Sequence, residues 1–119
     1  MILSGGIKRS GYIALFGDKL GIGFAEVCIR DYANGCRAQP VPFLEGIWIE
    51  PEYRQRGIGK DLVDAIKLDL IDQGFHELCS DSHIENTIAH DAHRRWGFDE
   101  TERVIYFRKS LDKEGTLLR

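Results

Sequence analysis

EPEYRQRGIGK, residues 50–60, lies between two segments of different hydrophobic pattern. The preceding run, Phe43 to Ile49, is rich in apolar residues and is typical of a central β-strand that is buried on both faces. The following residues, Ile58 to Ile71, place apolar side chains at helical spacing and predict one face of an α-helix. The stretch therefore predicts the end of a strand, a glycine-rich basic turn and the start of a helix.

This turn has the features of an anion-binding site. The first N–H groups of a helix have no partner inside the helix, and together with the positive end of the helix dipole they bind anions. Gly57 and Gly59 leave space for contacts between the backbone and a ligand. Arg54, Arg56 and Lys60 bring positive charge to the same place. We therefore expect the turn to bind phosphate.

Two familiar phosphate-binding loops do not fit this turn. A P-loop needs Ser or Thr after its lysine, where this chain has Asp61. A dinucleotide-binding loop needs a third glycine, where it has Leu62. The remaining pattern, Arg-x-x-Gly-x-Gly over residues 54–59, resembles the acetyl-CoA pyrophosphate loop of the GNAT superfamily of N-acetyltransferases. The alternative is an ordinary strand–helix turn with solvated arginines.

The composition fits one folded domain over residues 1–119. Of the 119 residues, 43% are hydrophobic and 29% are charged, which is enough apolar material for a core. The formal net charge of −3 argues against a nucleic-acid partner and suits a cationic substrate. No run approaches the ~20 apolar residues of a membrane helix, so we expect no membrane partner.

The cysteines and histidines do not indicate a disulfide or a metal site. Cys28, Cys36 and Cys79 are odd in number and contain no C-x-x-C pair, which predicts free thiols in a reducing cytoplasm. Cys28 and Cys79 lie in apolar runs, which favours packing over nucleophilic chemistry. His90 and His93 share a predicted helix face, but no cysteine or carboxylate completes a known ligand spacing. We expect no metal.

The first third of the chain predicts a β-hairpin after a loose start. Met1 to Gly11 shows no period. Tyr12–Phe16 and Leu20–Arg30 are apolar runs on either side of the turn residues 17–19, and they predict two antiparallel strands. Residues 31–42 form a long loop, which is a candidate for ligand contact.

The second half predicts a strand–helix–strand unit. Gly74 is placed to end the helix that begins near Ile58, and Phe75–Cys79 has the character of a further strand. A strand, a helix and a strand at this spacing predict a βαβ unit with a right-handed crossover and parallel pairing. The remaining patterns predict a helix over Thr87–Trp96 with Asn86 as its N-cap, and a last strand over Val104–Phe107.

Four stretches, taken in order, are similar to one branch of this superfamily. They are residues 43–59, SDSHIENT at 80–87, HRRWGF at 93–98 and ETERVIYFRK at 100–109. Over about residues 21–111 the chain resembles the aminoglycoside 6′-N-acetyltransferases. This resemblance implies an α/β GNAT acyl-CoA N-acyltransferase fold, with a mixed sheet around the central βαβ unit. Members of the family begin with a strand and two helices ahead of the hairpin, and we expect this chain to lack them.

The resemblance also implies a function and a donor site. Members transfer an acetyl group from acetyl-CoA to the 6′-amine of an aminoglycoside antibiotic, and so confer resistance to it. The backbone of the central strand would hold the pantetheine arm, and the turn would hold the pyrophosphate. The implied acetyl-CoA contacts are Ile47, Trp48, Ile49, Arg54, Gln55, Arg56, Gly57, Ile58, Gly59, Lys60 and Asn86.

Three side chains match positions with a chemical role in the family. A carboxylate near the thioester, acting directly or through a water, takes the proton of the attacking amine; Glu45 matches this base and also a substrate contact. Asp81 matches a residue that pairs with an ammonium group of the substrate. His93 stands where many members place a tyrosine that protonates the departing CoA thiolate. The structural alternatives are a strand-edge residue, a turn residue and a helix-surface residue, respectively.

Three functions stay open at this point. The first is acetyl transfer to an aminoglycoside, the second is acetyl transfer to another small amine, and the third is a catalytically impaired remnant that binds CoA. The expected absence of the N-terminal segment favours the third. A homodimer is expected under all three, because an incomplete sheet has exposed edges that need covering.

Overall fold

The computed structural model describes residues 2–5, 9–16 and 20–112. A four-stranded antiparallel sheet in the order β1-β2-β3-β4 is followed by a short 3₁₀ helix and two α-helices. The bounds of these elements are β1 Ile2–Gly5, β2 Arg9–Phe16, β3 Leu20–Arg30, β4 Val41–Ile49, η1 Pro51–Tyr53, α1 Ile58–Asp72 and α2 Thr87–Arg95.

The predicted hairpin is confirmed, but the predicted loose start is wrong. β2 pairs with β3 in antiparallel register, with Tyr12 opposite Ala25, and the turn at 17–19 lies outside the described residues. Ahead of the hairpin, β1 pairs with β2, with Ile2 opposite Ala14. A strand this short is fixed by its hydrogen bonds to a neighbour, which its own sequence does not reveal. No helix precedes the hairpin in the described part of the chain.

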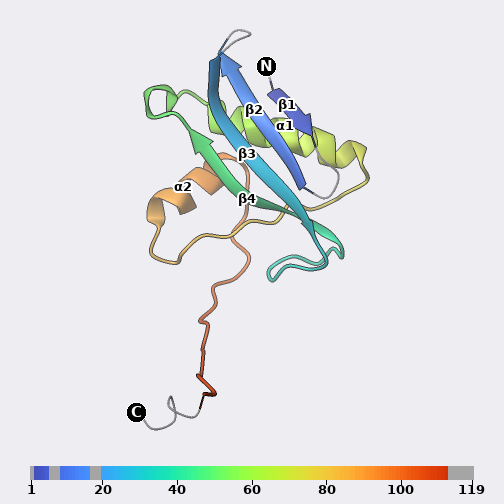
Figure 1. Cartoon of the computed structure of the whole chain (residues 1–119), viewed down its shortest axis with the longest axis vertical. Coiled ribbons are helices and arrows are strands. Elements are labelled where there is room, and N and C mark those ends of the chain that lie inside the picture. Colours follow the sequence, from blue (N-terminus) through green and yellow to red (C-terminus); the bar gives the residue numbers. More distant parts are fainter. Residues whose placement is uncertain (1, 6–8, 17–19, 113–119) are drawn as a thin grey trace.

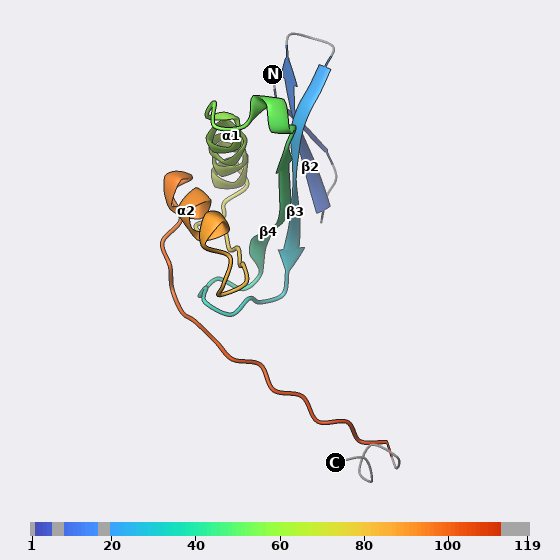
Figure 2. The same cartoon turned by 90° about the vertical axis from the view of Figure 1, so that its left-hand side faces the viewer.

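Both α-helices lie on the same face of the sheet (Figure 2). Side chains from this face of the sheet, such as Tyr12 and Val27, form one buried cluster with the inner side of α1. Leu62, Ile66 and Leu70 supply the helix's part of the core, as their four-residue spacing predicts. Burial of each such side chain contributes on the order of 2 kcal/mol to folding.

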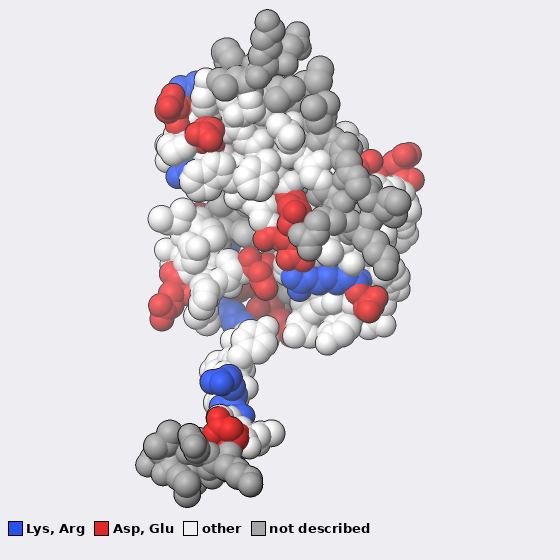
Figure 3. Space-filling model, in the orientation of Figure 1, with Lys and Arg blue, Asp and Glu red and all other residues white. Residues whose placement is uncertain are grey.

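The other face of the sheet is not covered by a helix in the described part of the chain. An apolar row crosses it, because Ile13 lies opposite Phe24 and Phe24 lies opposite Trp48. These side chains are 41%, 49% and 47% exposed, respectively. Acidic side chains gather near the middle of this face (Figure 3).

β4 is buried in its first half only, so the predicted burial on both faces is half right. Val41 to Leu44 are buried, whereas Glu45 and Gly46 are exposed next to a bulge in the pairing with β3. The predicted strand Phe75–Cys79 is reduced to one parallel bridge, between Phe43 and Cys79. The βαβ unit is present, with α1 as its crossover and this single bridge as its parallel pairing (Figure 1).

The C-terminal part contains the second expected helix but not the last expected strand. Asn86 caps α2, since its side-chain oxygen accepts a hydrogen bond from the Ala89 N–H at 3.1 Å. Residues 101–112 form neither helix nor strand and run away from the body of the molecule (Figure 1). The prediction of a strand over Val104–Phe107 is therefore wrong for this single chain, because the segment pairs with no strand in the part of the chain that the structure describes.

Candidate active site

The predicted phosphate-binding turn joins β4 to α1 through η1. Gly57 is the N-cap of α1 and has a φ of 83°, in the left-handed region where glycine is favoured. Gln55 also has a positive φ, of 62°. The Asp61 N–H bonds to the Gly57 carbonyl at 3.0 Å, which is the first hydrogen bond of the helix. The N–H groups of residues 58–60 therefore stand in the first turn, where a helix offers them no carbonyl.

The two glycines of the turn are needed for different reasons. No atom lies within 4 Å of the position a Cβ would take at Gly57, so the space expected for a ligand is open there. A Cβ at Gly59 would lie 2.7 Å from Nε1 of Trp96 and 3.0 Å from Cε2. The expectation that Gly59 makes room for a ligand is therefore corrected, since it makes room for the indole that follows α2.

The three cations of the turn are exposed and each contacts a neighbour. Arg54 donates from Nε to the Ile49 carbonyl at 2.8 Å, and its guanidinium carbon lies 4.5 Å from the Trp48 ring centroid. Arg56 lies over the Tyr53 ring, at 5.3 Å. The Lys60 ammonium bonds to Asp64 at 2.7 Å, and this hydrogen bond is the main reason that the pKa of Lys60 is raised.

The backbone edge of β4 that faces away from β3 is paired at one place. The Leu44 N–H donates to the Cys79 carbonyl at 2.8 Å, and the Cys79 N–H donates to the Pro42 carbonyl at 2.9 Å. Beyond Leu44, no bridge joins residues 45–49 to the segment that ends at Cys79 in the described part of the chain. The peptide groups around Ile47 to Ile49 therefore have one side without a strand.

Glu45 lies at the β-bulge and is held by an arginine. Arg30 donates from Nε to one carboxylate oxygen at 3.0 Å and from a terminal nitrogen to the other at 2.8 Å. The guanidinium carbon of Arg30 also lies 3.5 Å from the centroid of the Phe43 ring. Its pKa is raised mainly by the hydrogen bonds to Glu45, and the negative charge of Asp81 adds to this. The structure thus brings Glu45 and Asp81 into reach of one cation, Arg30, which the sequence had not indicated.

His93 has a partner on each ring nitrogen. Nδ1 lies 2.6 Å from the Ala89 carbonyl oxygen, which only accepts, so Nδ1 carries a proton. Nε2 lies 2.8 Å from the hydroxyl oxygen of Ser80. The ring also packs against Trp96 and Phe98, with centroids 5.2 and 5.1 Å away. In the neutral ring with its proton on Nδ1, Nε2 therefore accepts a hydrogen bond from the Ser80 hydroxyl.

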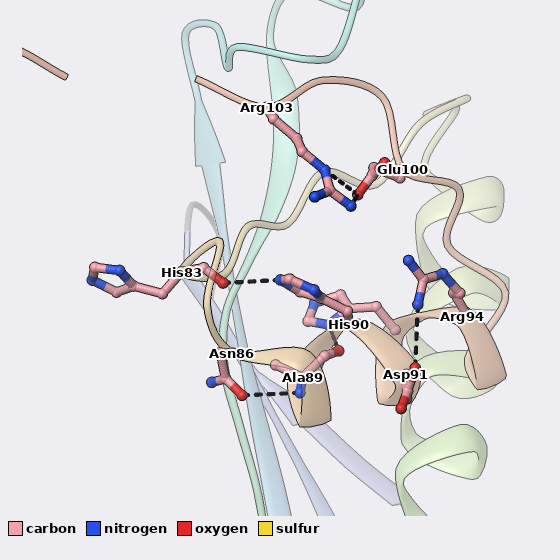
Figure 4. A network of polar contacts seen from close by, with 9 residues as sticks. His83, Asn86, Ala89, His90, Asp91, Arg94, Glu100 and Arg103 are labelled. Carbon is pink, nitrogen blue, oxygen red and sulfur yellow. Dashed lines mark hydrogen bonds and ion pairs between the residues drawn. The ribbon is translucent and has the colours of Figure 1, made fainter. Parts of the chain in front are cut away.

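Asn86, His83 and His90 make hydrogen bonds at the N-terminal part of α2. His90 projects from α2 to the His83 carbonyl, 2.9 Å from Nε2, while the ring of His83 points away from α2 (Figure 4). The Asn86 side-chain oxygen serves as the N-cap (Figure 4). In the part of the chain that the structure describes, no three His, Cys, Asp or Glu side chains group as they would around a metal ion.

An open cavity of about 1550 Å³ lies among α1, α2 and residues 75–84. Of the predicted site residues, Lys60, Asp81 and His93 line it, together with Arg30 and Ser80. The others lie outside its lining, namely Glu45, Ile47, Trp48, Ile49, Arg54, Gln55, Arg56, Gly57, Ile58, Gly59 and Asn86. The cavity is therefore lined by only three of the residues predicted to bind acetyl-CoA or to act on the acceptor amine.

The thiols near this cavity are packed rather than activated. Burial, followed by a hydrogen bond with Cys79, raises the pKa of Cys36 to about 12. Such a thiol stays protonated at neutral pH and is a poor nucleophile. All three cysteines are free.

A membrane-spanning helix was not expected from the sequence. In the described part of the chain, neither α1 nor α2 has the length and apolar content that a membrane span requires.

Comparison with known proteins gives the class of the molecule. Residues 7–98 match the sequence model of the acetyltransferase (GNAT) family. This match covers most of the 119 residues, so the chain belongs to the GNAT acetyltransferase family and is an acetyltransferase by class.

The similar proteins share one kind of name. The chain is 48% identical over 107 residues to the aminoglycoside N(6')-acetyltransferase type 1 of Salmonella typhimurium, with 87% of this chain and 74% of the relative covered. It is 46% identical to the relative of that name from Stenotrophomonas maltophilia, over 85% of this chain and 67% of the relative.

Two solved structures agree with the fold. The first is AAC(6')-Iy in complex with the bisubstrate analogue CoA-S-monomethyl-acetylneamine. It superposes with a TM-score of 0.80 at 44% identity, covering 89% of this chain and 72% of its own. The second is AAC(6')-Ih from Acinetobacter baumannii, with a TM-score of 0.81 at 38% identity, covering 90% and 74%, respectively. The expected GNAT fold is confirmed.

Proposed function

We propose that this acetyltransferase transfers the acetyl group of acetyl-CoA to the 6′-amine of an aminoglycoside. The observation that carries the proposal is the 48% identity over 107 residues to an aminoglycoside N(6')-acetyltransferase. The structural neighbour with a CoA–acetylneamine analogue supports the same pair of substrates. The carboxylates Glu45 and Asp81, both within electrostatic reach of Arg30, suit a substrate with several ammonium groups.

In this proposal the donor binds along β4 and at the start of α1. The pantetheine amides pair with the peptide groups of Ile47 to Ile49, on the side of β4 that has no strand in the described part of the chain. The pyrophosphate lies against the first turn of α1, where Gly57 leaves open space. Arg54, Arg56 and Lys60 turn from their present exposed contacts toward its charge.

The acceptor amine attacks the thioester carbonyl carbon, and a proton leaves its nitrogen. Glu45 receives this proton through a water. Both oxygens of Glu45 now bond to Arg30, so an ammonium group of the substrate competes with the guanidinium for the carboxylate. In this proposal, Arg30 keeps Glu45 in place until the substrate arrives.

The tetrahedral intermediate collapses as its C–S bond breaks, and the thiolate of CoA takes up a proton. We assign this proton to Ser80, whose hydroxyl lies 2.8 Å from Nε2 of His93. Ser80 gives its proton to sulfur, and a protonated His93 replaces it from Nε2. In this proposal His93 is still the source of the proton, but the proton reaches the sulfur through Ser80 and not directly.

Two narrower properties belong to the same proposal. The free thiols of Cys28, Cys36 and Cys79 suit the reducing cytoplasm, where acetyl-CoA is available. Two copies of the chain assemble as a homodimer. The competing functions remain acetyl transfer to another small amine and CoA binding without turnover.

The test is release of free CoA thiol from acetyl-CoA in the presence of kanamycin, tobramycin or a polyamine. We expect turnover with the two aminoglycosides, and a loss of about 100-fold or more in kcat for Glu45→Gln. Glu52→Gln, at an exposed position in η1, is the matched control and should keep full activity. Turnover with the polyamine alone supports the second function. CoA binding without release from any amine leaves only the third.

A further inference from the structure

Ser80 and His93 form a hydrogen-bonded pair of the kind that activates a hydroxyl group. The Ser80 hydroxyl oxygen lies 2.8 Å from Nε2 of His93, and Nδ1 of the same ring lies 2.6 Å from the Ala89 carbonyl oxygen. In the neutral ring, the carbonyl keeps the proton on Nδ1 and leaves the lone pair of Nε2 facing the hydroxyl. A hydroxyl, a base and a group that orients the base are therefore in contact, which is the arrangement of a serine nucleophile.

The imidazole is held in this orientation by packing as well as by hydrogen bonds. Its centroid lies 5.2 Å from that of the Trp96 ring and 5.1 Å from that of the Phe98 ring. The Phe98 N–H donates to the His93 carbonyl at 2.9 Å, which fixes the backbone at the end of α2. Ser80 and His93 are both half-buried and line the open cavity. The base thus has one orientation beside a hydroxyl that a ligand can reach.

Ser80 lies where β4 and the segment Phe75–Cys79 separate. The Leu44 N–H bonds to the Cys79 carbonyl at 2.8 Å, and among the described residues no later bridge joins the two segments. Because the segments run parallel, Glu45 is the first residue on one side of the gap and Ser80 is the first on the other. A group at the closed end of this gap therefore has these two side chains as neighbours.

The proposed path of the donor brings its thioester to this closed end. The pyrophosphate is assigned to the turn at 54–60, and the pantetheine arm runs from there along Ile49 to Ile47. The far end of the arm, which carries the thioester, then points toward Glu45 and Ser80. The inference below rests on this donor part of the proposed function, and it needs no bound amine.

We propose that Ser80 is an acetyl-accepting nucleophile, so that without an amine the protein hydrolyses acetyl-CoA by way of an acetyl ester on this serine. When an amine is bound, the amine attacks the thioester directly, and Ser80 serves as the proton donor described above. The second activity therefore takes the same thioester as substrate and water as the final acceptor.

The steps of this hydrolysis balance without a further reagent. The Ser80 oxygen bonds to the thioester carbonyl carbon while Nε2 of His93 removes the hydroxyl proton. The C–S bond then breaks, and the CoA thiolate takes that proton from Nε2, which leaves free CoA thiol and acetyl-Ser80. A water next attacks the ester carbonyl carbon and gives a proton to Nε2. The C–O bond to Ser80 breaks, the serine oxygen takes the proton back, and acetic acid leaves.

The first test uses acetyl-CoA and the full chain without any amine. We expect continuing release of CoA thiol. Samples that are quenched with acid during turnover should carry one acetyl group on the peptide that contains Ser80. Hydroxylamine should remove this group, because it cleaves esters and leaves acetylated lysine intact. Thiol release no faster than in buffer overturns the proposal, and so does the absence of the ester from samples quenched during turnover.

The second test changes the serine alone. Ser80→Ala removes the nucleophile, and we expect the amine-independent release to fall by about 100-fold or more. Ser82→Ala is the matched control, at an exposed position two residues further on that also lines the cavity, and it should keep the rate. Circular dichroism checks that both variants are folded. Release that persists in Ser80→Ala means that water attacks the thioester directly, and it contradicts the proposal.

The third test separates chemistry from a structural role of the histidine. His93→Gln replaces the base by a neutral amide that still forms hydrogen bonds but takes up no proton. We expect this variant to fold and to lose about 100-fold or more of the amine-independent release. A folded variant with an unchanged rate would show that the contact with Ser80 only ties α2 to the neighbouring segment, and would overturn the proposal.

The outcome is independent of the proposed acceptor. If kanamycin is acetylated but no thiol is released without an amine, this inference fails and the proposed function stands. If Ser80-dependent release occurs and no aminoglycoside is acetylated, the inference stands and the proposed acceptor fails.

Discussion

Gly59 shows how one residue links the donor turn to α2. Its missing side chain admits the indole of Trp96, so Gly59→Ala places a methyl group 2.7 Å from Nε1. We expect this change to lower the free energy of unfolding by about 1–3 kcal/mol, the usual cost of overpacking. Chemical denaturation measures it. In the background Trp96→Leu the same change should cost much less, and an equal cost in both backgrounds would show that the indole is not the cause.

Arg30 is the residue whose removal should favour the acceptor. If the guanidinium competes with a substrate ammonium for Glu45, Arg30→Gln lowers KM for the amine by up to about fivefold, the range of an ion pair worth up to about 1 kcal/mol. Steady-state kinetics at saturating acetyl-CoA measures this effect. Arg37→Gln, another exposed arginine, controls for net charge and should leave KM unchanged. An unchanged or higher KM for Arg30→Gln would argue against competition.

Among the elements, α2 depends on its N-cap. The Asn86 side-chain oxygen binds the Ala89 N–H at 3.1 Å, so Asn86→Ala should lower the free energy of unfolding by about 1 kcal/mol. Asn86→Asp keeps the oxygen and should keep most of the stability, but it loses the amide donor proposed to contact pantetheine. We therefore expect a higher KM for acetyl-CoA in Asn86→Asp. Full stability of Asn86→Ala would contradict the cap.

The helices could be predicted from the sequence because their signals are local. Ile58 to Ile71 and Thr87 to Trp96 carry their own period and caps, and the observed helices differ from them by one residue at the C-terminal end. Strands depend on distant partners. β1 exists through its pairing with β2, while the expected strand over Val104–Phe107 has β-type residues but pairs with no strand among the described residues.

The site could be predicted only in part, for the same reason. The turn at 54–60 is contiguous and was found from its own residues. Arg30 and Ser80 were missed, because their importance comes from contacts with Glu45 and His93, which lie 15 and 13 residues away. Register across β3 and β4 decides the first contact, and the docking of α2 on residues 75–80 decides the second. A polar residue at the end of each predicted strand was the only available signal.

At the scale of the whole molecule, the helices of the described residues pack on one face of the sheet only. α1 and α2 lie on one face (Figure 2), whereas the row formed by Ile13, Phe24 and Trp48 is exposed. The edge of β4 beyond Leu44 is proposed for the donor, because no strand among the described residues pairs with its peptide groups.

The account centres on acetyl transfer to a 6′-amine, and one matched pair of substrates tests it most directly. Neomycin carries an amine at the 6′ position, where paromomycin carries a hydroxyl group, and the two molecules are otherwise the same. With acetyl-CoA and the full chain, mass spectrometry should find a singly acetylated neomycin and unchanged paromomycin. Acetylation of both to the same extent, or of neither, would contradict the assignment of the 6′-amine as acceptor.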